Sequence, residues 1–407
     1  MLDTIIIGGG AAGLMSAIHS IDNNKNILLI EKMSQCGRKL RITGKGRCNL
    51  TNMLEMDDFL KSCGPNPEFL RPSFQAFFNQ DLVSLMNSLG VPLKEERGRR
   101  VFPKSNKSLD VFLAMINKIE NSPNARILKN SIVTEILKKD NRAIGVRLGN
   151  NKEYYADKII LATGGKSYPL TGSNGEGYAL SKNLGHSIVR PIPGLVGFEL
   201  DHRIPRRLID FPLRNVEARI LDKDGNVLAK DFGEMTFGKA SAYGPIIISL
   251  NRRVSRDLYN GEKLRLSLDL KPSLSCQKLE NKIKREIDIR GDEPIESFLR
   301  TMMPRQLIEL FVRTTKLYGS SYDLDREDKD LIIKSIKNLE FDIKGDLGFR
   351  EAIVTLGGID TREINPHTLE SKLIKGLFFA GEVMDVDADT GGYNLQIAFS
   401  TGVLASK

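Results

Sequence analysis

The hydrophobic pattern is clearest at the start of the chain, where two short apolar runs flank a small-residue segment. Residues 4–7 are β-branched and predict a buried strand, residues 14–20 predict a helix, and residues 27–30 predict a second buried strand that ends at Glu31. The order strand, helix, strand is typical of one half of a parallel α/β sheet.

The next part of the chain is mainly helical and then becomes β. Residues 57–121 have apolar positions at spacings of three and four, interrupted by a basic segment at 91–103 that predicts a hairpin or loop. Residues 126–148 alternate apolar and polar positions, and we expect them to form a small antiparallel insertion. Residues 158–161 predict another buried strand.

Residues 190–194 interrupt this pattern with prolines and a glycine and predict a domain boundary. Beyond it we expect an all-β module, with a hairpin around the Asp224-Gly225 turn and an alternating strand at 264–270. Residues 273–338 return to helical spacing. We expect this β module with its helical insertion to select the substrate.

The end of the chain returns to the first pattern. Residues 352–356 and 376–380 predict two strands, and residues 390–396 open a last helix of small and apolar residues. The positive N-terminal end of that helix would favour a ligand group that carries negative charge.

The glycines after the first strand carry the main functional signal. Gly8, Gly10 and Gly13 have the G-x-G-x-x-G spacing, which permits a tight turn, close approach of a pyrophosphate, and close packing of helix on strand. Glu31 stands where a carboxylate accepts the ribose hydroxyls of an adenosine. Glycines also end ordinary strands, but the ordered strand, turn, helix, strand and acid together favour dinucleotide binding.

Three further segments fit a bound cofactor. The glycine-rich and basic loop at 37–52 is either solvated or wrapped around the cofactor, and its position after Glu31 favours wrapping, with Cys48 as a small packed residue. Residues 162–165 (ATGG) place backbone with small or no side chains at the end of a strand, where a ligand can approach it. Glu382 is either an ordinary strand-end acid or the acceptor of a ribityl hydroxyl. The glycines at 172–177 do not have a second fingerprint spacing, so we expect no dedicated NAD(P)H domain.

Composition narrows the class of protein. The 407 residues suffice for two or three domains, and no 18-residue apolar run or signal-peptide core occurs, so we expect a cytoplasmic protein without a membrane partner. The four cysteines form no C-x-x-C pair, which argues against disulfides and zinc. Asp385, Asp387 and Asp389 lack the rest of an EF-hand loop, so we expect no metal.

The formal net charge of +9 raises the question of nucleic acid. The basic residues occur in many short groups, such as 97–100 and 206–207, and none makes a long stripe. We therefore interpret the excess as a solvated surface and do not expect nucleic acid as a partner.

Segments 37–52, 162–165 and 380–396 (AGEVMDVDADTGGYNLQ) together resemble the aminoacetone oxidase-like family of FAD-dependent oxidoreductases, which includes reductases of dehydrogenated bile acids. The resemblance spans nearly the whole chain. It implies an FAD-binding fold with an inserted β-barrel and helical subdomain. Lys45 stands where the family has glycine, and residues 237–245 (FGKASAYGP) lack the family's histidine.

The motifs and the resemblance together define the expected architecture. The fold class is α/β, with a Rossmann-like FAD-binding domain of the glutathione-reductase-like class at 1–190 plus 346–407. A β-barrel-like substrate domain comprises 191–272 plus 340–345, with a helical insertion at 273–339. The expected cofactor-binding residues are Gly8, Gly10, Ala11, Ala12, Gly13, Glu31, Lys32, Gly37, Arg38, Lys39, Thr43, Gly44, Gly46, Arg47, Cys48, Asn49, Val133, Ala162, Thr163, Gly164, Gly381, Glu382, Gly391, Gly392, Asn394, Leu395 and Gln396.

The expected activity is reduction of an activated C=C or C=O bond of a small organic substrate, with non-covalent FAD and NAD(P)H as a transient donor. The alternatives are an amine oxidase that uses O2 and, more distantly, an RNA-associated flavoprotein. Tyr168, Tyr393, Lys45 and Arg47 are the polar groups expected near the flavin ring. The proton donor, the natural substrate, the choice between NADH and NADPH, and the oligomeric state stay open.

Overall fold

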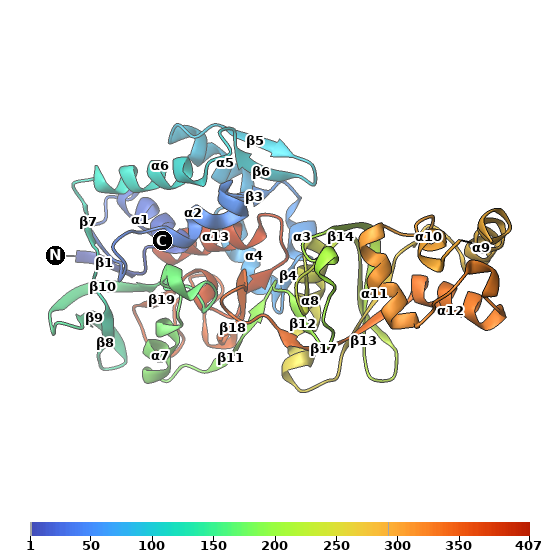
Figure 1. Ribbon diagram of the computed structural model, residues 1–407. Coiled ribbons are helices and arrows are strands. Elements are labelled where there is room, and N and C mark those ends of the chain that lie inside the picture. The colour runs from blue at the N-terminus through green and yellow to red at the C-terminus, as the bar shows by residue number, and fades with distance from the viewer. Residues whose placement is uncertain (1, 292) are drawn as a thin grey trace. The chain divides into compact units, whose positions relative to one another are not determined.

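The computed structural model describes residues 2–291 and 293–407 (Figure 1). They form two units, each with its own hydrophobic core. Unit 1 comprises Met1–Pro193 and Ile353–Lys407, and unit 2 comprises Gly194–Ala352.

The main sheet of unit 1 has the strand order β7-β2-β1-β10-β9-β8, with β19 paired to β10. Its parallel strands are β1 (Leu2–Ile7), β2 (Ile27–Ile30), β7 (Ala125–Leu128), β10 (Glu153–Leu161) and β19 (Leu377–Phe379). Strands β8 (Val133–Lys139) and β9 (Arg142–Leu148) continue it in antiparallel pairing. Ile5 lies opposite Ile159 on one side and Leu28 on the other, and all three are fully buried, which explains the uninterrupted apolar runs.

The helices of unit 1 include the first and last of the chain, which pack on each other. Ser16 Oγ donates to Gly402 O at 2.9 Å, and a Cβ on Gly402 would lie 2.5 Å from Ala12 O, so glycine permits the close approach. These helices are α1 (Ala11–Asp22), α2 (Arg38–Ile42), α3 (Met56–Leu60), α4 (Pro67–Ala76), α5 (Asn79–Ser88), α6 (Ser108–Glu120), α7 (Glu176–Asn183) and α13 (Tyr393–Ser406).

Smaller sheets complete unit 1. In one of them β6 (Arg100–Pro103) lies between β3 (Thr51–Asn52) and β5 (Leu93–Glu96). The other two pair β4 (Cys63–Gly64) with β20 (Asp387–Ala388), and β11 (Ile188–Gly194) with β18 (Val354–Ile359). Short 3-10 helices are η1 (Thr43–Gly46), η2 (Pro169–Thr171), η5 (Thr361–Glu363) and η6 (Gly381–Val383).

Unit 2 contains a closed barrel and a group of helices. The barrel order is β12 (Phe198–Leu200), β15 (Ser241–Tyr243), β14 (Val227–Phe237), β13 (Pro212–Leu221), β16 (Arg265–Asp269) and β17 (Leu339–Asp346). The helices are α8 (Pro245–Tyr259), α9 (Cys276–Arg290), α10 (Ile295–Leu299), α11 (Arg305–Thr315) and α12 (Arg326–Lys337), with η3 (Arg206–Leu208) and η4 (Ser321–Asp323). Helix α8 packs on β14, and α12 packs on β16 and β17.

Several predicted elements differ from the structure. The segment expected to be all-β contains helix α8, because Ile246, Ile247, Leu250 and Val254 bury one helical face although their β-branched run resembles a strand. Residues 190–194 lie in strand β11, whose prolines are tolerated since it pairs with one strand only, and the division between the two units, between Pro193 and Gly194, falls within this segment. Strand β7 joins the main parallel sheet rather than the antiparallel insertion.

The expected fold class, a Rossmann-like domain with an inserted barrel, agrees with this topology. The exact domain boundaries, and the helical segment as a domain of its own, stay predictions. Within residues 2–291 and 293–407, no helix is long and apolar enough to cross a membrane.

Candidate functional site

A cavity lies in unit 1 where β1 and β10 end and α1 begins. Its walls come from three stretches far apart in the chain, within residues 7–43, 131–180 and 353–398. The carboxyl ends of parallel strands are where α/β sheets bind ligands.

The glycine turn forms one wall of the cavity, and each glycine has a distinct steric role. Gly8 has φ +103°, and a Cβ there would lie 2.6 Å from Ala162 O. A Cβ on Gly13 would lie 1.9 Å from Gly8 O, so this position holds α1 against the turn. A Cβ on Gly10 would meet no atom within 4 Å, which leaves open space beside the backbone. These are the three roles expected of a pyrophosphate-binding turn.

The start of α1 is suited to an anion. Its N-cap residue, Gly10, has no side chain to accept from the first amides, and the first turn contains no acidic residue. The unpaired N–H groups and the helix dipole therefore favour a phosphate at this wall.

Glu31 is held by two backbone donors. Gly9 N donates to Glu31 Oε2 and Met33 N donates to Glu31 Oε1, each at 2.8 Å. The carboxylate lines the cavity with lone pairs left for the hydroxyls of a ribose. The nearby thiol of Cys36 stays neutral, because burial and then the charge of Glu31 raise its pKa to about 12.

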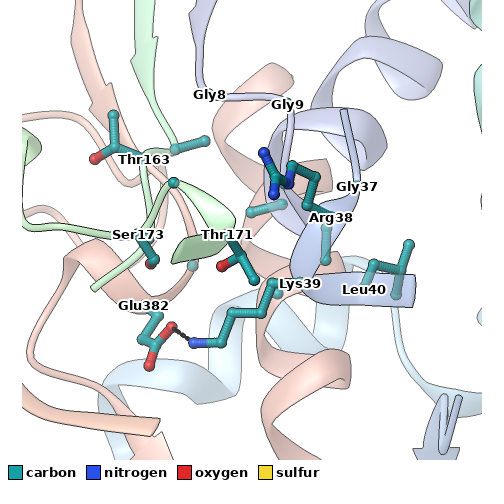
Figure 2. A pocket seen from close by; sticks show the side chains of 18 of the residues that line it. Gly8, Gly9, Gly37, Arg38, Lys39, Leu40, Thr163, Thr171, Ser173 and Glu382 are labelled. Atoms are coloured by element: carbon teal, nitrogen blue, oxygen red, sulfur yellow. Dashed lines mark hydrogen bonds and ion pairs between the residues drawn. The ribbon is translucent and has the colours of Figure 1, made fainter. Parts of the chain in front are cut away.

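A polar network crosses another part of the cavity wall. Lys39 Nζ donates to Glu382 Oε2 at 2.8 Å, and in Figure 2 these two side chains point toward each other. Ser167 Oγ donates to Glu382 Oε1 at 3.0 Å and accepts from Lys39 Nζ at 2.5 Å, while Thr355 N donates to Glu382 Oε1 at 2.6 Å. The acid expected to accept a ribityl hydroxyl is thus held by an ion pair and two further donors.

Thr163 lines the cavity, but its hydroxyl does not face it. Thr163 Oγ1 is inaccessible to solvent, and a Cβ on Gly177 would lie 2.0 Å from it, so this oxygen packs against α7. The fit to a ligand rests instead on the open space at Gly10, the uncapped start of α1 and the carboxylate of Glu31. Together these features indicate that the residues present fit a dinucleotide such as FAD.

Most of the expected site residues meet at this cavity. Those that line it are Gly8, Gly10, Ala11, Ala12, Glu31, Lys32, Gly37, Arg38, Lys39, Thr43, Val133, Ala162, Thr163, Gly164, Gly381, Glu382, Asn394 and Leu395. Those that do not line it are Gly13, Gly44, Gly46, Arg47, Cys48, Asn49, Gly391, Gly392 and Gln396.

The shape of the loop after α2 explains why several of these residues do not line the cavity. Gly44, Lys45, Gly46 and Cys48 all have left-handed backbone, which curls the loop so that only Thr43 lines the cavity. Arg47 donates to Glu96 at 2.5 Å and lies over the Phe102 ring at 4.2 Å.

Two other residues expected near the ring do not line the cavity either. Tyr393 packs edge-on against Phe59, with ring centroids 4.7 Å apart, and Tyr168 is absent from the wall. Cys48 is fully buried, and burial raises its pKa to about 12, which excludes a reactive thiolate at neutral pH.

The structure also brings in residues that the sequence did not single out. Thr171 and Ser173 line the cavity (Figure 2), and Ser173 Oγ donates to Gly165 O at 3.2 Å. Ser167 and Thr355 act behind the wall through Glu382. The glycine-rich composition of 172–177 could have pointed to Thr171 and Ser173. No local feature of the sequence marks Thr355.

Comparisons with known proteins agree with this geometry. A family model described as the HI0933-like protein Rossmann domain matches residues 2–407. The chain is 30% identical to a 3-dehydro-bile acid delta(4,6)-reductase of Clostridium scindens, covering 99% of this chain and 97% of that protein. It is 28% identical to a ribosomal RNA dihydrouridine synthase of Escherichia coli, covering 98% and 96%.

Solved structures show the same fold. A 3-ketosteroid-delta4-(5alpha)-dehydrogenase of Rhodococcus jostii matches with a TM-score of 0.53 at 15% identity, over 99% of this chain and 95% of that chain. The predicted fold class is confirmed.

Proposed function

The chain belongs to the HI0933-like family of FAD-dependent oxidoreductases, and we propose that it reduces a C=C bond conjugated to a carbonyl group, with NAD(P)H as the donor. The resemblance stated from the sequence motifs is thereby confirmed. The reducible bond, the donor and the roles of individual site residues are the proposed part.

The observation that carries the proposal is the glycine turn with open space at Gly10, set in a chain that matches a bile-acid delta(4,6)-reductase along nearly its whole length. The names of both relatives denote the addition of hydrogen to a carbon–carbon double bond. A C=C bond next to a carbonyl is the chemical feature that we infer for this chain's substrate.

The cavity residues have separate roles in holding FAD. Glu31 would accept from the adenosine ribose, and the amides at the start of α1 would face the pyrophosphate, with Arg38 offsetting its charge while Lys39 stays paired with Glu382. Asn394 and Leu395 place the first turn of α13 at the wall, where the helix dipole favours negative charge. When bound, FAD supplies hydride-transfer chemistry.

Anaerobic mixing of the purified yellow protein with NADH and NADPH tests the proposal. We expect a nicotinamide to bleach the flavin absorbance, and we expect an added enone such as 2-cyclohexenone to restore it. Bleaching by aminoacetone, with colour restored only by O2, would instead support the amine oxidase alternative.

A second candidate substrate is a uracil base in RNA. The observation that favours it is the match to ribosomal RNA dihydrouridine synthases of Escherichia coli and Haemophilus influenzae, at 28% and 27% identity. Incubation with ribosomal RNA and NADPH, followed by nucleoside mass spectrometry, would then show uridine gaining two hydrogens. An unchanged mass with enone turnover intact would assign the activity to small molecules.

We also propose a cytoplasmic location. Within residues 2–291 and 293–407 no disulfide joins Cys36, Cys48, Cys63 or Cys276, as expected in a reducing compartment.

A further inference from the structure

The net positive charge of the chain comes from two segments. Residues 38–47 include five basic and no acidic residues, and residues 94–107 include six basic and two acidic residues. Their joint net charge equals the +9 of the whole chain, so the other residues balance one another. The excess is therefore concentrated, contrary to the scattered pattern inferred from the sequence.

Both segments lie in unit 1, and the structure joins them. The first forms α2, η1 and Arg47, and the second forms the β5–β6 hairpin and the loop that leads into α6. Arg47 donates to Asn106 at 3.1 Å and to Glu96, and Ser108 Oγ donates to Arg41 O. Figure 1 shows β5 and β6 near α2 and α6, so the charges share one region of unit 1.

The acidic residues of this region are already paired. Glu96 accepts from Arg47 at 2.5 Å and from Lys94 at 2.9 Å, and Glu95 lies 3.8 Å from Arg99. The exposed basic residues that have no carboxylate partner within the described part of the chain are Lys45, Arg97, Arg100, Lys104 and Lys107. We call these five residues the basic surface.

A recess beside the cofactor cavity brings two further arginines close to one end of the basic surface. The recess is lined by Arg38, Arg41, Ser34 and Ser108, and it shares Gln35, Arg38 and Thr171 with the cavity wall. Ser108 follows Lys107 of the basic surface directly in the chain. Arg41 has no carboxylate partner in the described chain and donates to Gln35 at 2.7 Å.

We propose that the basic surface binds the phosphate backbone of a nucleic acid. Guanidinium and ammonium groups spread over exposed loops suit a chain of phosphates better than one small anion. Phe102, the aromatic ring of this region, is buried beneath Arg47, so it offers no platform for stacked bases. Binding is therefore expected to be strongly salt-dependent and tolerant of sequence.

The proposal does not rest on reduction of a small enone, because binding at this surface requires no turnover, and the surface would also hold the RNA of the second candidate substrate. The test compares wild type with Arg97→Gln/Arg100→Gln/Lys104→Gln/Lys107→Gln. The matched control is Lys25→Gln/Lys138→Gln/Lys139→Gln/Lys182→Gln, which removes four exposed charges of unit 1 that also have no ion pair in the described chain. Fluorescence anisotropy measures binding of labelled single-stranded RNA and single-stranded DNA over a range of salt concentrations.

We expect the first variant to bind more weakly and to reduce the slope of log K against log salt by about 3, since each phosphate contact to a single strand contributes roughly 0.7. The control variant is expected to keep the wild-type slope. Preference for RNA or for DNA identifies which nucleic acid supplies the backbone.

Equal slopes for the two variants would overturn the proposal, as would wild-type binding to heparin but to neither nucleic acid. If the quadruple variant does not fold, Arg97→Gln/Lys107→Gln, with both changes outside the strands, is expected to reduce the slope by about half as much. Enone reduction, measured in the same variants, is expected to be unchanged. If the wild-type protein does not reduce the enone, the proposed function is contradicted, but the measured binding of nucleic acid is not affected.

Discussion

At the scale of single residues, the glycine turn separates cofactor binding from folding. Gly10→Ala is expected to leave the stability of the flavin-free protein unchanged, since Gly10 has φ −78° and an added Cβ meets open space. The same Cβ occupies room for the pyrophosphate, so flavin affinity is expected to fall by about 1–3 kcal/mol, roughly 5- to 150-fold. Flavin titration and urea unfolding measure the two effects.

Gly13→Ala is the matched comparison for that change. Its Cβ would lie 1.9 Å from Gly8 O, so we expect the flavin-free protein itself to lose about 1–3 kcal/mol of stability. Equal flavin affinity in Gly10→Ala and wild type would contradict the placement of the pyrophosphate.

His186 is a second residue with a measurable consequence. Ser371 Oγ accepts from Leu373 N and Ile374 N, so its own proton is donated to His186 Nε2 at 2.8 Å, and His186 Nδ1 donates to Glu363 at 3.0 Å. Burial lowers the pKa of His186 below its ordinary value, although Glu363 opposes this shift. The folded protein therefore keeps this ring neutral where the unfolded chain is protonated.

His186 is expected to make the folded protein less stable at acidic pH. Below about pH 6.5 the unfolded chain binds a proton that the folded protein does not, so His186 is expected to lower the unfolding free energy as pH falls through that range. Urea unfolding of wild type and His186→Gln at several pH values checks this. The variant is expected to lose less stability on acidification, and parallel pH profiles would contradict the assignment.

Some residues of the site could be predicted from the sequence, and others could not. Gly8, Gly10, Gly13 and Glu31 could be predicted because their spacing is local and each has one steric or charge role. The Lys39–Glu382 pair could not, because its partners are 343 positions apart and only the fold brings them together.

At the scale of elements, the start of α13 is fixed by one close contact. A Cβ on Gly392 would lie 2.4 Å from Thr51 O in β3, and Gly392 has φ +99°. We expect Gly392→Ala to cost about 2–4 kcal/mol, the sum of left-handed strain and the clash. Gly185→Ala, at φ +98° with no atom within 4 Å, isolates the strain and is expected to cost about 1–2 kcal/mol.

Urea unfolding of both variants measures the difference between those two costs. Equal destabilisation would mean that α13 does not need its close approach to β3.

Prediction from sequence was good for elements with a clear period and poor where context decides. Strands β1 and β2 have uninterrupted apolar runs because both faces are covered. Helix α8 was missed since its β-branched start looks like a strand until its partner β14 is known. Strand β11 was missed because prolines usually mark loops.

At the scale of the whole molecule, every residue that lines the cavity belongs to unit 1. Replacing residues 194–352 with a short glycine-serine linker is therefore expected to leave a protein that still binds flavin. Reduction of the enone is expected to be lost if unit 2 selects the substrate. Flavin absorbance after gel filtration is the measurement, and a colourless protein would contradict an independent unit 1.

The contact between α1 and α13 has a consequence during synthesis. A ribosome that has translated only as far as unit 2 has produced the glycine turn, but residues 353–407, with the opposite wall of the cavity, do not yet exist. Capture of the cofactor thus has to follow translation of the last helix, and until then α1 exposes to the cytosol, or to a chaperone, the face that will meet Gly402.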